Sequence, residues 1–138
     1  MLTVSEQYIP TDSPFQITNK ATGFCLAKTH GVCREIRWTT AQRLLVPFLN
    51  KCLGVQGKSV GSEVTLYDCD EASEVQKWEC RNETVLALKG QELYIELNAD
   101  ATAVLSRTVG PNNHLTISGT SSGACTRTYR GLLVCSNY

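Results

Sequence analysis

The chain has 138 residues and a mass of 15.2 kDa, enough for one buried core and too little for two ordinary domains. Thirteen basic and thirteen acidic side chains leave a formal net charge of zero, so no global field attracts nucleic acid or an anionic membrane surface. No apolar stretch approaches the roughly 18 residues of a membrane span. We therefore expect no nucleic-acid partner and no direct membrane contact.

Short apolar segments recur along the chain and predict β-strands. They are rich in β-branched and aliphatic residues and often alternate with polar ones, which is the strand period. Clusters of turn-forming residues separate them, and no helical stripe lasts ten residues. This pattern predicts an all-β domain, either a sandwich or a barrel-like trefoil. In chain order the predicted strands are 15–18, 44–46, 64–67, 84–88, 93–97, 103–105 and 115–117.

A weak threefold repeat favours the trefoil. Residues 23–27 resemble residues 50–54, and residues 36–39 resemble residues 76–79. A third copy without cysteines runs through 93–117. A four-strand unit cannot bury its own apolar face, so we expect three unequal four-strand repeats to share one core. The residues predicted to cap that core are Trp38, Trp78 and Leu115.

The cysteines predict disulfides and an oxidising compartment. There are seven, and none forms the Cys-x-x-Cys pair of zinc ribbons and redox sites. The opening residues lack the basic-then-apolar pattern of a signal peptide, which we interpret as a leader that was removed or a domain cut from a larger protein. The one N-glycosylation sequon, at Asn82, agrees with that compartment. The cysteines are Cys25, Cys33, Cys52, Cys69, Cys80, Cys125 and Cys135.

The central part of the chain resembles a known family. Gln76-Lys77-Trp78 matches the Gln-x-Trp signature of ricin-type trefoils. The longer runs 51–55, 65–70 and 76–84 resemble the N-terminal cysteine-rich domain of the mannose receptor family. The resemblance is closest over 48–90 and absent from the last dozen residues. It implies an N-terminal extension at 1–12, a disulfide-linked β-trefoil at 13–126 and a C-terminal tail at 127–138.

The resemblance also implies a pairing of the cysteines. Within-repeat bridges join Cys25 to Cys33 and Cys52 to Cys69, and Cys80 pairs with Cys125. Cys135 is then left over, either as a free thiol or as the bridge of a disulfide-linked dimer.

The family resemblance implies a lectin that lies outside the cell, secreted or on a receptor ectodomain. The mannose receptor itself recognises sulfated N-acetylgalactosamine, and related receptors often lack that activity. In that site a tryptophan of the third repeat stacks on the sugar. A gap-free alignment from Gly110 to Cys125 places Asn112 at that position, which predicts weak binding or none, and Asn98 matches a sulfate-side asparagine. The predicted sugar-binding residues are Asn98, Asp100, Arg107, Asn112, Asn113 and His114.

The candidate binding residues also have purely structural interpretations. Asn98 and Asn112 can be merely turn residues that tolerate positive φ, and a Gln-x-Trp tryptophan such as Trp78 suits a core better than a binding surface.

No catalytic constellation is evident, so we expect no enzyme, cofactor or metal site. The carboxylates of Asp68 and Asp70 lack a partner histidine, and His30 and His114 lack the context of a metal site or nucleophile. The leading hypothesis is a module that binds glycans or glycoproteins, with sulfated or acidic glycans as the candidate ligands. The alternative is a protein-interaction scaffold that has lost its sugar site. The Gln-x-Trp and Cys-Leu-Gly strings disfavour a trefoil protease inhibitor or a cytokine-like ligand.

Overall fold

The computed structural model of the protein describes residues 14–39 and 42–126, and this part of the chain is all-β. Within it there are three short 3-10 helices and no α-helix, and none of the described helices is long and apolar enough to cross a membrane. The strands are β2 (Ile17–Asn19), β3 (Lys28–Thr29), β4 (Val32–Cys33), β5 (Arg37–Trp38), β6 (Leu44–Val46), β7 (Lys51–Gly54), β8 (Thr65–Asp68), β9 (Trp78–Cys80), β10 (Leu86–Leu88), β11 (Tyr94–Leu97), β12 (Ala103–Ser106) and β13 (Leu115–Ile117). The 3-10 helices are η2 (Glu74–Gln76), η3 (Pro111–Asn113) and η4 (Ala124–Thr126).

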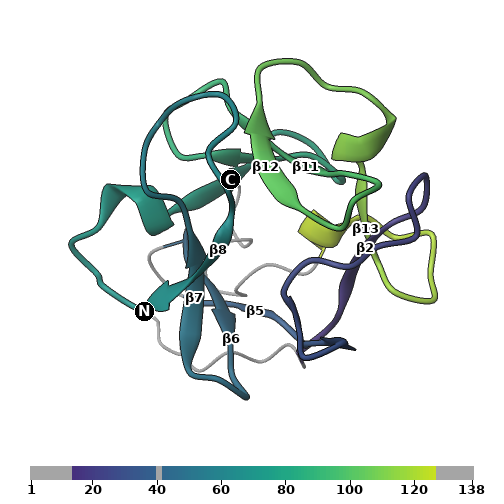
Figure 1. The fold of residues 1–138 in the computed structure, drawn as a ribbon, viewed down its shortest axis with the longest axis horizontal. Helices are drawn as coiled ribbons and strands as arrows, with labels where there is room; N and C mark the ends of the chain where they lie inside the picture. The colour runs from purple at the N-terminus through teal and green to yellow at the C-terminus, as the bar shows by residue number, and fades with distance from the viewer. Residues whose placement is uncertain (1–13, 40–41, 127–138) are drawn as a thin grey trace, which may run out of the picture.

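The strands form four small antiparallel sheets (Figure 1). Two of them are four-stranded meanders, β5-β6-β7-β8 and β9-β10-β11-β12, in which each strand pairs with the next along the chain. The hairpin β3-β4 forms a third sheet. Tight turns suffice to connect consecutive antiparallel strands, and this explains why clusters of turn formers separate the apolar segments.

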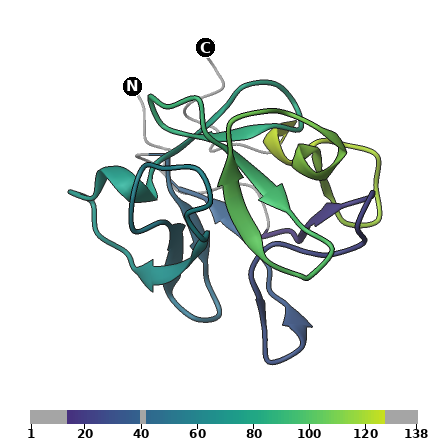
Figure 2. The ribbon, with the colours of Figure 1, turned by 45° about the horizontal axis from the view of Figure 1, so that its top comes forward.

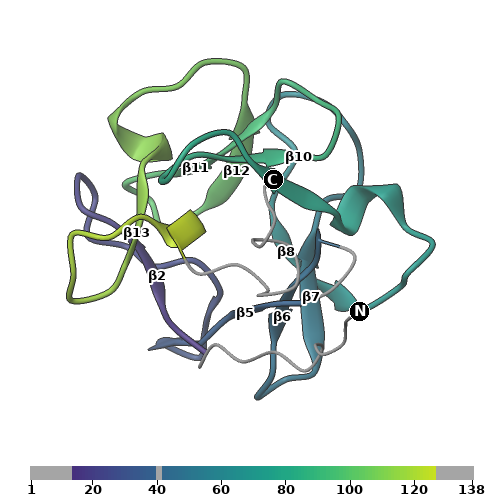
Figure 3. The same ribbon diagram turned by 180° about the vertical axis from the view of Figure 1, so that it is seen from behind.

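The fourth sheet joins segments from distant parts of the sequence. Strand β2 pairs with β13, with Asn19 opposite Leu115 and Ile17 opposite Ile117. Figure 3 shows the two strands side by side when the molecule is seen from behind. The first and last described strands therefore hold each other in place.

One hydrophobic core is shared by three of the four sheets, and the β3-β4 hairpin contributes no residue to it. It includes both tryptophans, with Trp38 5% exposed and Trp78 fully buried, together with Leu115. The indole Nε1 of Trp78 donates to the carbonyl of Leu53 at 3.0 Å, while the indole N–H of Trp38 has no acceptor among the described residues. Both tryptophans are thus buried, as the alternating strand pattern predicts, but they differ in hydrogen bonding.

Three disulfides link these strands, and they are the pairs that the family resemblance implies. Cys25–Cys33, Cys52–Cys69 and Cys80–Cys125 close loops of 8, 17 and 45 residues. Three bridges in a domain of this size indicate that it folds in an oxidising environment. Cys135, the predicted extension at 1–12 and the predicted tail at 127–138 lie outside the described residues.

Candidate functional site

The six predicted sugar-binding residues lie on two turns at opposite ends of strand β12. Asn98 and Asp100 belong to the turn between β11 and β12, and the other four follow β12. A strand rises about 3.3 Å per residue, so the two ends of this hairpin are roughly 15 Å apart. Figure 2 shows the β11–β12 turn on one side of the hairpin and the segment that follows β12 on the other. Asn98 and Asp100 are therefore separated from the other four predicted residues, and the six do not form one pocket.

The β11–β12 turn is fixed by its own side chains. The carboxylate of Asp100 accepts hydrogen bonds from the Thr102 hydroxyl at 2.6 Å and the Thr102 N–H at 3.1 Å. These bonds stabilise the ionised form, so they lower the pKa of Asp100 below its usual 3.8. The positive φ of this turn, 69°, is at Ala101, and neither Asn98 nor Asn112 is among the described residues with positive φ. Both asparagines therefore lie in turns, and neither adopts a positive φ there.

Asn113 has a structural role that corrects its assignment as a sugar ligand. Its side chain is 2% exposed, and its Nδ2 donates to the carbonyl of Ile95 at 3.0 Å and to the hydroxyl of Ser106 at 3.1 Å. Its Oδ1 accepts the N–H of Gly110 at 2.8 Å. Both amide hydrogens and the oxygen are thus used to hold η3 against the β11–β12 hairpin.

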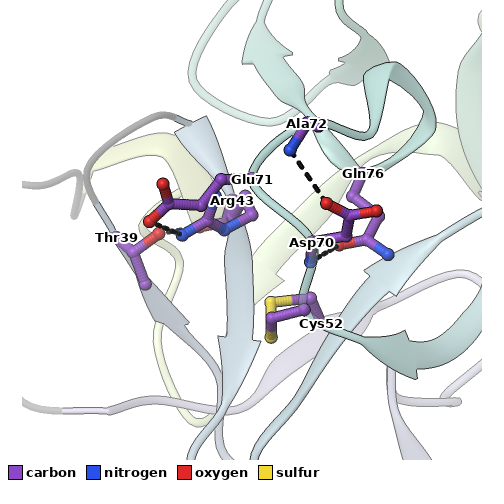
Figure 4. A network of polar contacts seen from close by, with 8 residues as sticks. Thr39, Arg43, Cys52, Asp70, Glu71, Ala72 and Gln76 are labelled. Atoms are coloured by element: carbon purple, nitrogen blue, oxygen red, sulfur yellow. Dashed lines mark hydrogen bonds and ion pairs between the residues drawn. A yellow bond between two sulfur atoms is a disulfide. The ribbon is translucent and has the colours of Figure 1, made fainter.

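One signal in the sequence indicates this role. Asn113 stands two residues before Leu115, as Gln76 stands two residues before Trp78, and Gln76 is buried in the same way. Its Nε2 donates to the carbonyl of Asp68 at 2.9 Å, and its Oε1 accepts the N–H of Asp70 at 3.0 Å (Figure 4). The amide of the Gln-x-Trp pattern and that of Asn113 are therefore equivalent anchors.

The remaining three residues present free polar groups beside this anchored turn. Arg107 and His114 are exposed and Asn112 is half-buried. Neither Arg107 nor Asn112 has a side-chain hydrogen bond within the described part of the chain. The Nδ1 of His114 lies 2.7 Å from the Thr84 hydroxyl, which fixes the imidazole and leaves its other nitrogen for a ligand. A cation, an amide and an imidazole in one turn can bind the hydroxyls or acidic group of a small polar ligand.

An aromatic side chain lies at the same end of the hairpin. Tyr94 is directly opposite Ser106 in the β11–β12 ladder and is half-buried. Its neighbour Ile95 points into the core, so by strand alternation Tyr94 faces outward. A phenol ring on this outer face provides an apolar surface of the kind on which a sugar ring can stack.

A cavity of about 130 Å³ lies elsewhere, and none of the six predicted residues lines it. Its walls come from four parts of the sequence, namely residues 25–29, Leu53, residues 63–66 and residues 97–103, so no local motif could indicate it. Typical ligand pockets measure about 300–1,000 Å³, so this cavity is small for an organic ligand. The exposed turn after β12 remains the better candidate.

No protein-family model matches the chain. Fold and site together define a small, disulfide-linked all-β domain with a polar surface site on an anchored turn. In the described ranges no three His, Cys, Asp or Glu side chains gather where they could hold a metal ion.

Proposed function

We propose that the protein is a β-trefoil carbohydrate-binding module, not an enzyme, that works outside the cell as a secreted protein or part of a receptor ectodomain. The trefoil is supported by the strand topology, which divides into three four-strand units. Two units are the meanders β5–β8 and β9–β12, and the third combines β13 with β2, β3 and β4. The first strand of each unit carries a large core residue, namely Trp38, Trp78 or Leu115.

The equivalent amides support the same proposal. Gln76 and Asn113 each end a 3-10 helix that precedes the first strand of a unit, and each ties that helix to a strand of a neighbouring hairpin. Repeated anchors at repeated positions are expected of a fold built from related units. They are not expected of a sandwich, whose strands need no threefold equivalence.

Sugar binding is supported chiefly by one observation, the free polar groups of Arg107, Asn112 and His114 on a rigidly held turn. A pyranose presents hydroxyls that such groups can hydrogen-bond, and the Arg107 guanidinium suits a sulfate or carboxylate substituent. Pre-organisation by Asn113 lowers the entropic cost of binding. Because Asn112 supplies no stacking face, we expect weak affinity for sulfated N-acetylgalactosamine.

Calorimetry on the variant Asn112→Trp tests this proposal. With sulfated N-acetylgalactosamine we expect about 10- to 100-fold tighter binding than in the parent, equivalent to the 1–3 kcal/mol of an added stacking aromatic. Val60→Trp is the matched control, because it adds the same indole at an exposed position in another loop and should change nothing. Arg107→Ala should remove the preference for the sulfated over the unsulfated sugar.

The second candidate function is a protein-interaction scaffold that has lost its sugar site. The observation that favours it is the amide of Asn112 where the family has a stacking tryptophan. If neither the parent nor Asn112→Trp binds any sugar at millimolar concentration, the scaffold becomes the better interpretation.

A further inference from the structure

Two arginines share the outer face of the sheet that contains β5 and β6. Arg37 lies on β5 opposite Leu45, and Arg43 lies immediately before β6, where its carbonyl accepts the N–H of Thr39 at 2.9 Å. The alternate residues Trp38 and Leu44 point into the core. Arg37 and Arg43 are therefore diagonal neighbours on the opposite face, at a spacing that long side chains bridge easily.

Several N–H donors of these guanidinium groups are buried and have no acceptor among residues 14–39 and 42–126. They are Nε of Arg37 and both Nε and Nη1 of Arg43. A guanidinium does not lose its proton in a protein, so it cannot escape the cost of burial by becoming neutral. Charged donors withdrawn from water without a partner are among the costliest groups in a folded domain.

The charge on this face is poorly compensated by the described residues. The Oε2 of Glu71 lies 3.7 Å from Nη2 of Arg43 (Figure 4), and its side chain is 87% exposed while that of Arg43 is only 11% exposed. An exposed carboxylate at this distance contributes little, and it approaches Nη2 rather than Nε and Nη1. One carboxylate against two guanidinium groups also leaves a net positive charge.

Two described side chains close to Glu71, those of Asp70 and Gln76, do not supply the missing acceptors. Figure 4 shows the carboxylate of Asp70 turned toward the N–H of Ala72, to which it is hydrogen-bonded at 3.0 Å. The amide of Gln76 is taken up by Asp68 and Asp70.

We propose that Arg37 and Arg43 form a binding site for a single oxoanion group, a sulfate, phosphate or carboxylate, which displaces Glu71. Such a group has two or more oxygens at the spacing of adjacent guanidinium N–H donors, and it neutralises the excess charge. The site lies on the β5–β6 face, distinct from the turn after β12. It therefore does not depend on the sugar-binding proposal.

The test compares thermal unfolding of the parent and of Arg43→Met at equal ionic strength in chloride, sulfate, phosphate and acetate. We expect a saturable rise in the Tm of the parent with at least one oxoanion, because a ligand that binds only the folded state stabilises it. Arg43→Met should lose that rise. It should keep the general stabilisation by sulfate that acts on every protein. Arg81→Met is the matched control, since Arg81 is exposed and paired with Glu79, and it should respond like the parent.

A second measurement uses the unmodified chain, so its result does not depend on whether a variant folds. The Nε–H resonances of Arg37 and Arg43 should shift together during an anion titration and give the same Kd. Glu71→Gln should bind severalfold more tightly, because a competing carboxylate is removed. Equal salt responses in the parent and Arg43→Met, or unmoved arginine resonances at saturating anion, would overturn the proposal.

The source of the oxoanion is decided by a third comparison. A sulfated monosaccharide, its unsulfated parent sugar and inorganic sulfate are titrated against the same two arginine resonances. Tighter binding of the sulfated sugar than of sulfate identifies a group carried on a glycan, and equal affinity identifies a free ion. Movement of the arginine resonances by the unsulfated sugar alone would contradict an oxoanion site.

Discussion

Asn113 and Gln76 hold two different parts of the fold by the same arrangement of hydrogen bonds. Each side-chain amide is buried at the end of a 3-10 helix, donates to a strand carbonyl about 3 Å away and accepts one backbone N–H. We expect Asn113→Ala to lower the free energy of unfolding by about 1–3 kcal/mol, because buried partners lose their hydrogen bonds. Asn112→Ala, in the same helix, should change it by less than about 0.5 kcal/mol.

Urea unfolding of both variants checks this prediction. Equal losses of stability in the two variants would show that Asn113 is not a special anchor of the turn.

The two tryptophans should respond differently to the same substitution. Trp78→Phe removes the bond to the Leu53 carbonyl and leaves that carbonyl unpaired, so we expect it to be destabilising by about 1–3 kcal/mol beyond the loss of packing. Trp38→Phe removes an N–H that has no acceptor within the described chain, so only the loss of packing remains.

Chemical denaturation of Trp78→Phe and Trp38→Phe measures the difference in their free energies of unfolding directly. Trp78→Ala should cost about 3–5 kcal/mol and unfold a marginally stable domain. If Trp78→Ala kept the parental Tm and lost only ligand binding, Trp78 would be a site residue instead of a core residue.

Asn82 stabilises a turn independently of any glycan. Its Oδ1 accepts the N–H groups of Thr84 and Val85, each at 2.9 Å, and lies 3.2 Å from the Thr84 hydroxyl. We expect Asn82→Asp to abolish glycosylation while it preserves the turn, and Asn82→Ala to abolish glycosylation and cost about 1 kcal/mol.

Mass spectrometry of the variants from a secretory host measures the loss of the glycan. Unfolding of the unglycosylated forms measures the loss of stability that results from removing Oδ1. Equal stability of the Asp and Ala variants would refute the structural role of Oδ1.

The disulfide that closes the longest loop should stabilise the fold more than the one that closes the shortest loop. In the chain-entropy model, closing the 45-residue loop of Cys80–Cys125 stabilises by about 4 kcal/mol, against about 2.5 kcal/mol for the 8-residue loop of Cys25–Cys33. Paired Cys→Ser variants, unfolded under identical non-reducing conditions, test which disulfide stabilises the fold more.

Peptide mapping of the protein under non-reducing conditions should find Cys135 alkylated or in a dimer. A bridge from Cys135 to one of the other six cysteines would disprove that assignment.

Strands with apolar alternation could be predicted from the sequence, and strands without it could not. The predicted segments 93–97 and 115–117 match β11 and β13 because every second residue there enters the core. The two-residue strands β3 and β5 are too short for a period to be visible. Their pairing is determined by the tertiary fold and, for β3, by the nearby Cys25–Cys33 bridge.

The candidate site was harder to predict than the fold. Asn98 and Arg107 are close in sequence, but the strand between them carries them apart, and sequence proximity alone cannot show this. Arg37 and Arg43 resemble ordinary solvated residues in the sequence, because the burial of their N–H groups arises only when strands and loops assemble. The anchoring role of Asn113 was open to prediction, since its spacing to Leu115 copies that of Gln76 to Trp78.

The pairing of β2 with β13 also constrains how the chain can fold as it is synthesised. Thr18 and Thr116, which meet in this sheet, are 98 residues apart, and ribosomes add about 5–20 residues per second. Strand β2 therefore waits roughly 5–20 s for its partner to emerge. During that interval the apolar face of Ile17 is open to chaperones, and the β5–β8 meander can form first because its pairings are local.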